Sequence, residues 1–408
     1  MKGLLINGGK KLQGTVMPQG SKNAALPMIF ASLIMCGTSI IEGVPDITDV
    51  RDAIEIISRL GAKCTFKEGA LYINSDGVAY TPPSSDLTSK IRASSYLLGA
   101  CLSRFGVVHM CAFGGCNFEY RPIDMHLYAA SAMGARIEGN TVVCDRLLGT
   151  DIRFDKASVG ATVNALLLSA SCEGRCRIFS YAREPHVLNL IDYLCSAGAD
   201  ITVLPDYIEV VGAPLSSGRC RVIPDMIEVG TYLAIGLATG SKISAACQAD
   251  GELLPFLGVM SEGGAEASTL DGKVSLFGEI RHPCKVITSP YPGFPTDLQP
   301  QSAPVMALFS GGEIVENVWL SRFGYLNALG KLGVKHERTG SCAGIFPSRL
   351  HSGIAEAPDL RGGAALLIAA LASSGESLIK NSDLIHRGYE NIVEKLRRIG
   401  ADITEIQL

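Results

Sequence analysis

The sequence lacks a basic excess, a long hydrophobic run and a leader-like start, and each absence excludes a class of protein. The 408 residues carry a formal net charge of −4, whereas nucleic-acid-binding proteins usually show a strong excess of Lys and Arg. The longest apolar runs, such as residues 364–372, are too short to span a bilayer. Residues 1–6 lead directly into a polar turn at 7–11, which is unlike a secretory signal. We therefore expect a cytoplasmic protein that binds neither nucleic acid nor a membrane.

The cysteines also lack a metal-binding or disulfide pattern. There are 13 of them, and although Cys172 and Cys176 are close together, no His or second Cys pair lies nearby to complete a zinc site. An odd number of cysteines in a chain without a secretory signal indicates reduced thiols. Most lie in apolar stretches, such as Cys36, Cys101 and Cys195, and we expect them to be small buried side chains.

What the chain does contain is a sixfold repeat. Short helical segments end in Gly followed by a small or apolar residue, at intervals of 73, 64, 66, 69 and 67 residues. The glycines concerned are Gly61, Gly134, Gly198, Gly264, Gly333 and Gly400. Six equal units of a 408-residue chain would each span 68 residues. A fixed period of this length indicates an internally repeated architecture.

A second set of glycines keeps the same step. Each ends an apolar, alanine-rich helix and precedes a strand, at intervals of 69, 68, 66, 71 and 64 residues. They are Gly37, Gly106, Gly174, Gly240, Gly311 and Gly375. Glycine accepts the left-handed conformation that ends a helix without a Cβ clash. A common helix ending would explain one or two matches, but not two sets in phase.

Each repeat is predicted to contain two helices and several short strands. The first helix is apolar almost all round and should be buried, whereas the second, for example residues 52–60, is amphipathic and should face solvent on one side. The repeat is longer than that of most helical solenoids, and no unit has the character of a polar cap. The sequence therefore predicts an α/β protein whose units close on one another, in two or three domains.

Three groups of polar residues could carry chemistry. The turn Gly20-Ser21 presents Lys22 and Asn23 where an apolar helix begins, and a helix start with a lysine favours an anion. Alone, this pattern also fits a solvated lysine.

The second group follows Gly114-Gly115, which place the Cys116 thiol on a glycine-rich loop. Arg121 lies close behind it, and a nearby cation lowers the pKa of a thiol and favours its reactivity. A turn that happens to hold a small hydrophobic residue would give the same pattern.

The third group lies in the second half of the chain. Asp297 follows a proline-constrained turn, Asp359 and Arg361 precede the buried helix of the last repeat, and Arg387 is expected to open its amphipathic helix. A carboxylate base with several arginines suits a reaction between a hydroxyl group and a phosphorylated co-substrate. Taken singly, each fits a surface ion pair or a helix cap.

Together these motifs resemble the UDP-N-acetylglucosamine 1-carboxyvinyltransferase family, over essentially the whole chain and in family order. The matching segments are residues 20–27, the Gly-Gly-Cys loop with residues 121–124, and residues 158–162, 183–185, 294–297, 359–361 and 387–390. The resemblance implies two domains, each of three βαβαββ-type units arranged as an inside-out α/β barrel. The domains would comprise residues 22–225 and residues 1–21 with 226–408, and the active site would lie in the cleft between them.

The resemblance also implies an addition–elimination enzyme that joins phosphoenolpyruvate to the 3′-hydroxyl of UDP-N-acetylglucosamine at the start of peptidoglycan synthesis. Asp297 would take the hydroxyl proton, and Cys116, the residue that fosfomycin alkylates in this family, would deliver a proton to C3 of phosphoenolpyruvate. Lys22, Arg121 and Arg387 would hold phosphate and carboxylate. No metal or organic cofactor is implied, and the expected protein is a monomer.

Further positions correspond to the family's substrate-binding residues. Asn23 would contact the reacting centre, and Asp359 and Arg361 would form a charged pair near it. The positions expected to hold the UDP-sugar are Arg92, Arg121, Pro122, Ile123, Asp124, Met125, Lys156, Ala157, Ser158, Val159 and Val318.

Five residues depart from the family pattern: Phe113, Glu119, His186, Met226 and His386. A carboxylate at Glu119 would oppose the binding of an anion nearby. Two other interpretations therefore stay open. One is a diverged enzyme that transfers the enolpyruvyl group to another nucleotide or sugar, and the other is a UDP-sugar-binding regulator without turnover.

Overall fold

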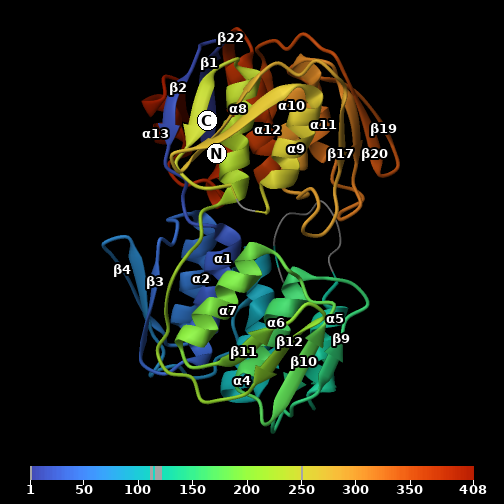
Figure 1. Ribbon diagram of the computed structural model, residues 1–408. Helices are drawn as coiled ribbons and strands as arrows, with labels where there is room; N and C mark the ends of the chain where they lie inside the picture. Colours follow the sequence, from blue (N-terminus) through green and yellow to red (C-terminus); the bar gives the residue numbers. More distant parts are fainter. Residues whose placement is uncertain (1, 111–113, 115–121, 250) are drawn as a thin grey trace. The chain divides into compact units, whose positions relative to one another are not determined.

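The structure is a computed structural model that describes residues 2–110, 114, 122–249 and 251–408. These residues form two compact units, and the described chain passes between them twice, after residue 19 and after residue 223. The middle unit contains residues 20–110, 114 and 122–223, and the terminal unit contains residues 2–19, 224–249 and 251–408. In Figure 1 the middle unit runs from blue to green, whereas the terminal unit combines the blue N-terminal strands with the yellow to red half of the chain.

The middle unit has three sheets among its described residues, with strand orders β13-β3-β5-β4, β6-β8-β7 and β11-β12-β10-β9. Its strands are β3 (Thr38–Glu42), β4 (Lys63–Lys67), β5 (Ala70–Asn74), β6 (Val107–His109), β7 (Arg136–Glu138), β8 (Thr141–Val143), β9 (Asp151–Arg153), β10 (Arg175–Phe179), β11 (Asp200–Val203), β12 (Tyr207–Val211) and β13 (Arg219–Arg221). Its helices are α1 (Lys22–Ala31), α2 (Thr48–Arg59), α3 (Ser85–Thr88), α4 (Leu97–Phe105), α5 (Asp124–Ala132), α6 (Val159–Ala170) and α7 (Pro185–Ser196), with 3-10 turns η1 (Ser32–Ile34) and η2 (Arg92–Tyr96).

The terminal unit repeats this plan, with sheets β21-β22-β1-β23, β15-β16-β14-β2 and β17-β18-β20-β19 among its described residues. Its strands are β1 (Lys2–Gly8), β2 (Gln13–Val16), β14 (Lys242–Ala245), β15 (Ala265–Leu270), β16 (Lys273–Gly278), β17 (Cys284–Ile287), β18 (Gly312–Val315), β19 (Lys335–Thr339), β20 (Cys342–Phe346), β21 (Ile354–Glu356), β22 (Gly375–Lys380) and β23 (Asp402–Gln407). Its helices are α8 (Met226–Ala238), α9 (Leu254–Gly263), α10 (Gln299–Leu308), α11 (Gly324–Gly330), α12 (Leu360–Ala372) and α13 (Ile392–Arg398), with the 3-10 turn η3 (Ser382–Arg387).

Three almost fully buried helices form the centre of each unit. They are α1, α4 and α6 in the middle unit and α8, α10 and α12 in the terminal unit. The amphipathic helices, such as α2, bury one face only. Burial of apolar side chains on all sides of a helix is possible only where sheets and other helices surround it. The predicted α/β class and the burial of each first helix are confirmed.

The glycines at equivalent positions of the six repeats share a left-handed backbone conformation. The six that follow the second helix of each repeat have φ between +95° and +119°, and the six that end the first helix have φ between +57° and +97°. These values lie in the left-handed region, where a Cβ atom is strained. Within each set, the glycine therefore makes an equivalent left-handed turn in all six repeats.

The cysteines correct one expectation from the sequence. Cys101 is buried as predicted, but Cys36 and Cys195 are exposed, because each lies at the end of a helical segment where the chain turns to the surface. Among the described residues, no helix combines the length and apolar character needed to cross a membrane.

Candidate active site

The Asp297 carboxylate is held by two buried arginines of the terminal unit. Arg322 Nη1 donates to Asp297 Oδ1 at 2.7 Å, and Arg361 donates to Oδ2 from Nε at 3.1 Å and from Nη2 at 2.9 Å. The arginine side chains are 6% and 2% exposed, whereas the Asp297 side chain is 28% exposed. Both carboxylate oxygens are thus oriented by charge-assisted bonds, and the group still reaches solvent.

The electrostatics of this cluster favour its charged form. Burial lowers the pKa of Arg361, but Asp297, Tyr389 and Asp225 together more than offset this effect, and the pKa lies above its ordinary value. The pKa of Arg322 is likewise raised, because Asp297 and Asp359 together offset the effect of burial. A guanidinium is the side chain best suited to such a buried pair, because it stays charged and bonds in two directions.

The N-cap of α12 places Asp359, the other charged residue of the predicted motif, next to Arg361. Asp359 is the N-cap of α12, and its Oδ1 accepts from the backbone N–H groups of Arg361 and Gly362, both at 2.9 Å. This satisfies orphan donors at the helix start and fixes Arg361 in the first turn. The motif around Asp359 is therefore a cap that positions Arg361 against Asp297.

A second carboxylate, the buried Glu316, organises the loop that carries Val318. It accepts from Thr288 Oγ1 at 2.7 Å and from Thr296 Oγ1 at 2.9 Å, and also from the backbone N–H groups of Val318 and Trp319, both at 2.9 Å. Thr296 in turn accepts from Arg322 at 3.1 Å. Val318 and Asp297 therefore belong to one hydrogen-bonded network.

The segment after Arg387 is held by hydrogen bonds to Gln19, a residue near the start of the chain. Gln19 Nε2 donates to the Gly388 carbonyl at 2.9 Å, and Gln19 Oε1 accepts from the Glu390 N–H at 2.6 Å. Between them, the Tyr389 ring lies 5.5 Å from the Arg361 guanidinium carbon. Arg387 ends the turn η3 and does not open α13, which begins at Ile392, so that expectation is corrected. The left-handed Asn391 interrupts the helix there.

Gln19 is also tied to the buried ion pair between Glu228 and Lys395. Glu228 Oε2 accepts from the Gln19 N–H at 2.6 Å, and Glu228 Oε1 lies 2.7 Å from Lys395 Nζ. Burial raises the pKa of Glu228 to about 7, against the opposing effect of Lys395. The Gln19 clamp, defined by Gln19, Glu228 and Lys395, thus joins the first and last repeats of the terminal unit.

In the middle unit, Lys22 is the first residue of the buried helix α1, as predicted, and Asn23 follows it in the first turn. Its Nζ lies 3.2 Å from Asp49 Oδ2, and the two side chains are only 13% and 6% exposed. A lysine at this position adds its charge to the positive end of the helix dipole. Lys22 is thereby held at the helix N-terminus, where an anion would be favoured.

Several predicted sugar-binding positions share a second neighbourhood of the middle unit. Arg92 Nη2 donates to the Pro122 carbonyl at 3.4 Å. Burial and Arg92 lower the pKa of the His126 ring to about 4, while Asp124 opposes them. His126 also closes over α6, because a Cβ on Gly160 would lie 2.6 Å from its Nε2. Ser158 caps this helix by accepting from the Ala161 N–H at 3.4 Å.

Other predicted positions flank these groups. Ile123 precedes α5, Asp124 and Met125 are in its first turn, Lys156 and Ala157 lie in the loop before α6, and Val159 begins α6. Cys116 and Arg121 lie outside the described residues, as do Phe113 and Glu119, so their roles stay predictions.

Sequence reasoning missed Arg322, Glu316 and Gln19. Arg322 and Glu316 flank Val318 within a few residues, and Gln19 directly precedes the Gly20-Ser21-Lys22 turn. Each of the three is a polar residue beside a recognised motif. Their contacts with the Asp297 cluster and with the segment after Arg387 are apparent only in the folded structure.

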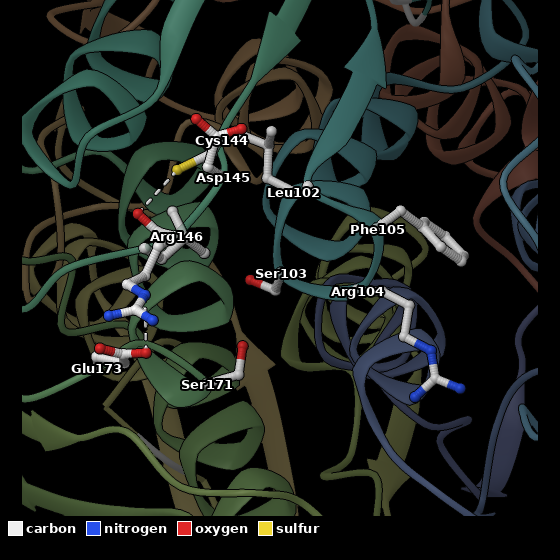
Figure 2. Close-up of a pocket in the computed structure, with 11 residues that line it drawn as sticks. Leu102, Ser103, Arg104, Phe105, Cys144, Asp145, Arg146, Ser171 and Glu173 are labelled. Atoms are coloured by element: carbon white, nitrogen blue, oxygen red, sulfur yellow. Dashed lines mark hydrogen bonds and ion pairs between the residues drawn. The ribbon is translucent and has the colours of Figure 1, made fainter.

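A hollow of about 490 Å³ in the middle unit contains none of these residues. It lies between the end of α4, residues 144–147 and the turn after α6 (Figure 2). Arg146 Nε is 3.0 Å from Glu173 Oε1, and Arg104 Nη2 donates to the Ser75 carbonyl at 3.2 Å. Both arginines are therefore engaged within the protein, and the hollow does not resemble the Asp297 site.

Comparison with known proteins agrees with the geometry over the full chain. The family model for EPSP synthase (3-phosphoshikimate 1-carboxyvinyltransferase) matches residues 6–396. The chain is 37% identical to UDP-N-acetylglucosamine 1-carboxyvinyltransferase 3 of Caldanaerobacter subterraneus subsp. tengcongensis, covering 100% of both chains. It is 36% identical to UDP-N-acetylglucosamine 1-carboxyvinyltransferase of Campylobacter hominis, covering 98% of each.

Solved structures extend this likeness to the fold. The enolpyruvyl transferase NikO from Streptomyces tendae has a TM-score of 0.89 at 25% identity, over 100% of this chain and 99% of that one. EPSP synthase from Acinetobacter baumannii has a TM-score of 0.72 at 17% identity over both full chains, which supports the fold alone. The predicted inside-out α/β fold is confirmed, and the chain belongs to the enolpyruvyl (carboxyvinyl) transferase family of enzymes.

Proposed function

We propose that this protein transfers the enolpyruvyl group of phosphoenolpyruvate to the 3′-hydroxyl of UDP-N-acetylglucosamine and releases phosphate, in the cytoplasm, as the first committed step of peptidoglycan synthesis. The observation that carries the proposal is the Asp297 carboxylate, oriented by Arg322 and Arg361 and still accessible to a substrate. The relatives named above, which share 36–37% of their residues with this chain, carry the name of that activity.

Asp297 is proposed as the base that removes the hydroxyl proton while the oxygen attacks C2 of phosphoenolpyruvate. A general base must keep its lone pair aimed at the proton that it takes, and the guanidinium groups that bond to Oδ1 and Oδ2 fix the orientation of the carboxylate. Cys116 is proposed to protonate C3. The tetrahedral intermediate then loses a C3 proton, which the Cys116 thiolate takes back, as the C2–O bond to phosphate breaks and the double bond is restored. The proton held by Asp297 passes to the released phosphate, so the steps need no oxidant and no net proton.

Cationic side chains are proposed to hold the phosphate and carboxylate of phosphoenolpyruvate. Lys22 stands at the start of α1, and Arg387 directly precedes the segment that Gln19 clamps. Arg121 is the third proposed cation. Because charge accumulates on phosphate as it leaves, fixed cations stabilise the transition state more than the substrate.

The test is release of inorganic phosphate from phosphoenolpyruvate in the presence of UDP-N-acetylglucosamine. We expect turnover with both substrates and background release with either one alone. Failure of folded protein to release phosphate, together with calorimetric binding of the UDP-sugar, would replace the proposal with a binding protein that has lost turnover.

The acceptor is tested separately, because Met226, which stands where the family carries arginine, is buried in the core of the terminal unit at 2% exposure. An acceptor panel should include UDP-N-acetylglucosamine, other UDP-sugars and free uridine nucleotides at equal concentration. We expect UDP-N-acetylglucosamine to give the highest kcat/KM. A better acceptor in the panel would identify a diverged enzyme of the same reaction class.

The proposed acid is tested by fosfomycin. We expect the protein to gain one fosfomycin adduct, located on Cys116 by peptide mass mapping, and to lose phosphate release in parallel. Cys116→Asp keeps a proton donor but no thiol, so it should gain no adduct. An adduct of equal yield in that variant would contradict the assignment.

A further inference from the structure

The buried thiols of Cys172 and Cys176 lie in contact within the third repeat. Their Sγ atoms are 3.7 Å apart, at the turn between α6 and β10. Cys176 is 0% and Cys172 4% exposed. Neither residue belongs to the proposed active site, and neither has a role in the proposed reaction.

The repeat itself explains why these two side chains meet. They stand two residues before and two residues after Gly174, whose φ of +94° reverses the chain from helix to strand. The same two positions around Gly37 in the first repeat hold Met35 and Ser39, and there Ser39 Oγ donates to Met35 Sδ at 3.4 Å. The fold thus brings these positions together, and the third repeat has a thiol at both of them.

The surroundings stabilise a thiolate at one member of the pair. Contact with the Cys172 thiol lowers the pKa of the Cys176 thiol, with help from the Ser169 hydroxyl and the Thr150 N–H, although burial opposes them. The pKa of the Cys172 thiol is raised by the same contact and by burial. An ionised thiol beside a protonated one is the arrangement in which one sulfur attacks and the other resolves.

A small reagent can approach the pair from the surface. Cys172 lines a hollow of about 420 Å³ together with Gly212 and Pro214. The neighbouring hollow of Figure 2 is lined by the residues on either side of Cys172, Ser171 and Glu173. The turn that holds Cys172 therefore lines two open depressions of the surface.

We propose that Cys172 and Cys176 form a redox-active dithiol that a peroxide converts into an intramolecular disulfide. The Cys176 thiolate attacks one oxygen of hydrogen peroxide, the O–O bond breaks, and hydroxide leaves with a sulfenic acid on Cys176. Cys172 sulfur then attacks the Cys176 sulfur, and the S–O bond breaks to release water. Two thiols and one peroxide thus give one disulfide and two waters.

The geometry permits this step with small movements. The sulfurs must approach from 3.7 Å to a bond of about 2.05 Å. Rotation about the two Cα–Cβ bonds changes this distance, and the Gly174 turn between the residues already holds the chain reversed. The product closes a ring around the turn without separating α6 from β10.

The test is peptide mapping of the folded full-length protein after treatment with a small excess of hydrogen peroxide. Free thiols are then alkylated in denaturant, and trypsin is added. Trypsin cuts after Arg175, so the disulfide would appear as a cross-linked pair of peptides, one ending at Arg175 and the other containing Cys176 and Arg177. We expect this pair before oxidation of the buried Cys101, and its loss on reduction with dithiothreitol.

Three further arms decide the result. Phenylarsine oxide, which bridges two adjacent thiols, should protect both cysteines from alkylation in the untreated protein. Cys172→Ser should stop at a sulfenic or sulfinic acid on Cys176, and Cys176→Ser should leave Cys172 as a thiol. Full alkylation of both residues in peroxide-treated wild-type protein would overturn the proposal, as would a cross-link that forms only after unfolding; neither result depends on the variants.

Discussion

The two units share one architecture but differ in what lies at the centre. In the middle unit the central helices α1 and α6, whose residues are all described, bury mainly apolar side chains and carry no buried charge except in the pair of Lys22 and Asp49, which lies at the start of α1. In the terminal unit the ends of α10 and α12 carry a charged network. Gln299 is 0% exposed there, and neither of its amide atoms has a hydrogen-bond partner among the described residues.

Burying polar groups has a cost in stability. A buried polar group without a partner costs about 1–3 kcal/mol. Tyr325 Oη is another such group near Arg322, and the middle unit also has such atoms among its described residues, for example Ser75 Oγ and His126 Nδ1. In a core that served stability alone, we would expect apolar residues at the positions of Gln299 and Tyr325 beside the Asp297 cluster. The comparison teaches that repeats of the same fold can be specialised, one for packing and the other for holding charge.

The largest expected effect follows from removing the charge of Asp297. Asp297→Asn keeps the shape of the side chain but removes the proposed base, and general-base catalysis contributes about 10²–10⁴-fold. We expect kcat for phosphate release to fall by that factor, measured per mole of protein that remains folded by circular dichroism.

The matched control lies in the middle unit, where both carboxylate oxygens of Asp46 also accept from an arginine, here Arg51 alone, at 2.6 and 2.7 Å and on the surface. Asp46→Asn should leave kcat unchanged. Similar losses of kcat in both variants would mean that the role of Asp297 is only structural.

The next effect concerns stability and separates the buried charge network from an exposed one. Arg361 is 2% exposed, so Arg361→Met removes one partner of a buried pair, which costs about 3–5 kcal/mol. Arg51→Met removes the partner of an exposed pair, for which about 0–1 kcal/mol is expected. Urea unfolding of both variants measures the difference. Equal losses would show that the terminal unit gains nothing from burying its charges.

Much of this architecture could be predicted from the sequence, because repetition exposes it. The glycines at intervals of 64 to 73 residues require the same left-handed turn in every repeat, so their spacing reveals the units without knowledge of the packing. The apolar helices were predictable for a similar reason, since burial on all sides leaves no periodicity.

The charged network could be predicted only in part. Asp297 and Arg361 stand in recognisable motifs, but 64 residues separate them, and nothing in either motif states that they touch. Arg322 and Glu316 could not be chosen, because an isolated charged residue in a loop is usually solvated. The exposed positions of Cys36 and Cys195 were missed because an apolar neighbourhood in sequence does not reveal where the chain turns outward.

A smaller effect is the pH dependence that Glu228 gives to the terminal unit. Its folded-state pKa of about 7 lies above the ordinary value of 4.5. The folded protein therefore binds more protons between these values, and its stability falls as pH rises through this window. Glu228→Gln removes the titration. We expect the stability of this variant relative to wild type to rise by about 1–3 kcal/mol from pH 5 to pH 8.

Glu42→Gln in the middle unit is the control for that measurement. Arg219, by hydrogen bonding, lowers the pKa of Glu42 below 4.5, against the effect of burial. Glu42 therefore stays ionised throughout this pH range, and its variant should differ from wild type by a constant amount. Urea unfolding at pH 5, 6, 7 and 8 gives both curves, and parallel behaviour of the two variants would contradict the raised pKa of Glu228.

The smallest expected effect compares helix caps in the two units. Asp225 Oδ1 accepts from the N–H groups of Ile227 and Glu228 at 3.0 and 3.1 Å, at the start of α8. Ser158 Oγ accepts one N–H at 3.4 Å, at the start of α6. Loss of a cap costs about 0.5–2 kcal/mol.

A charged cap with two short bonds stabilises a helix more than a neutral cap with a single long bond. The loss of stability for Asp225→Ala should therefore lie at the upper end of this range, and that for Ser158→Ala at the lower end. Urea unfolding without substrate, under conditions where the two units unfold in separate transitions, assigns each loss to its own unit. Equal losses in the free energy of unfolding for the two variants would contradict this expectation. The terminal unit would then depend more strongly on charge only in the cluster around Asp297, and not at its helix starts.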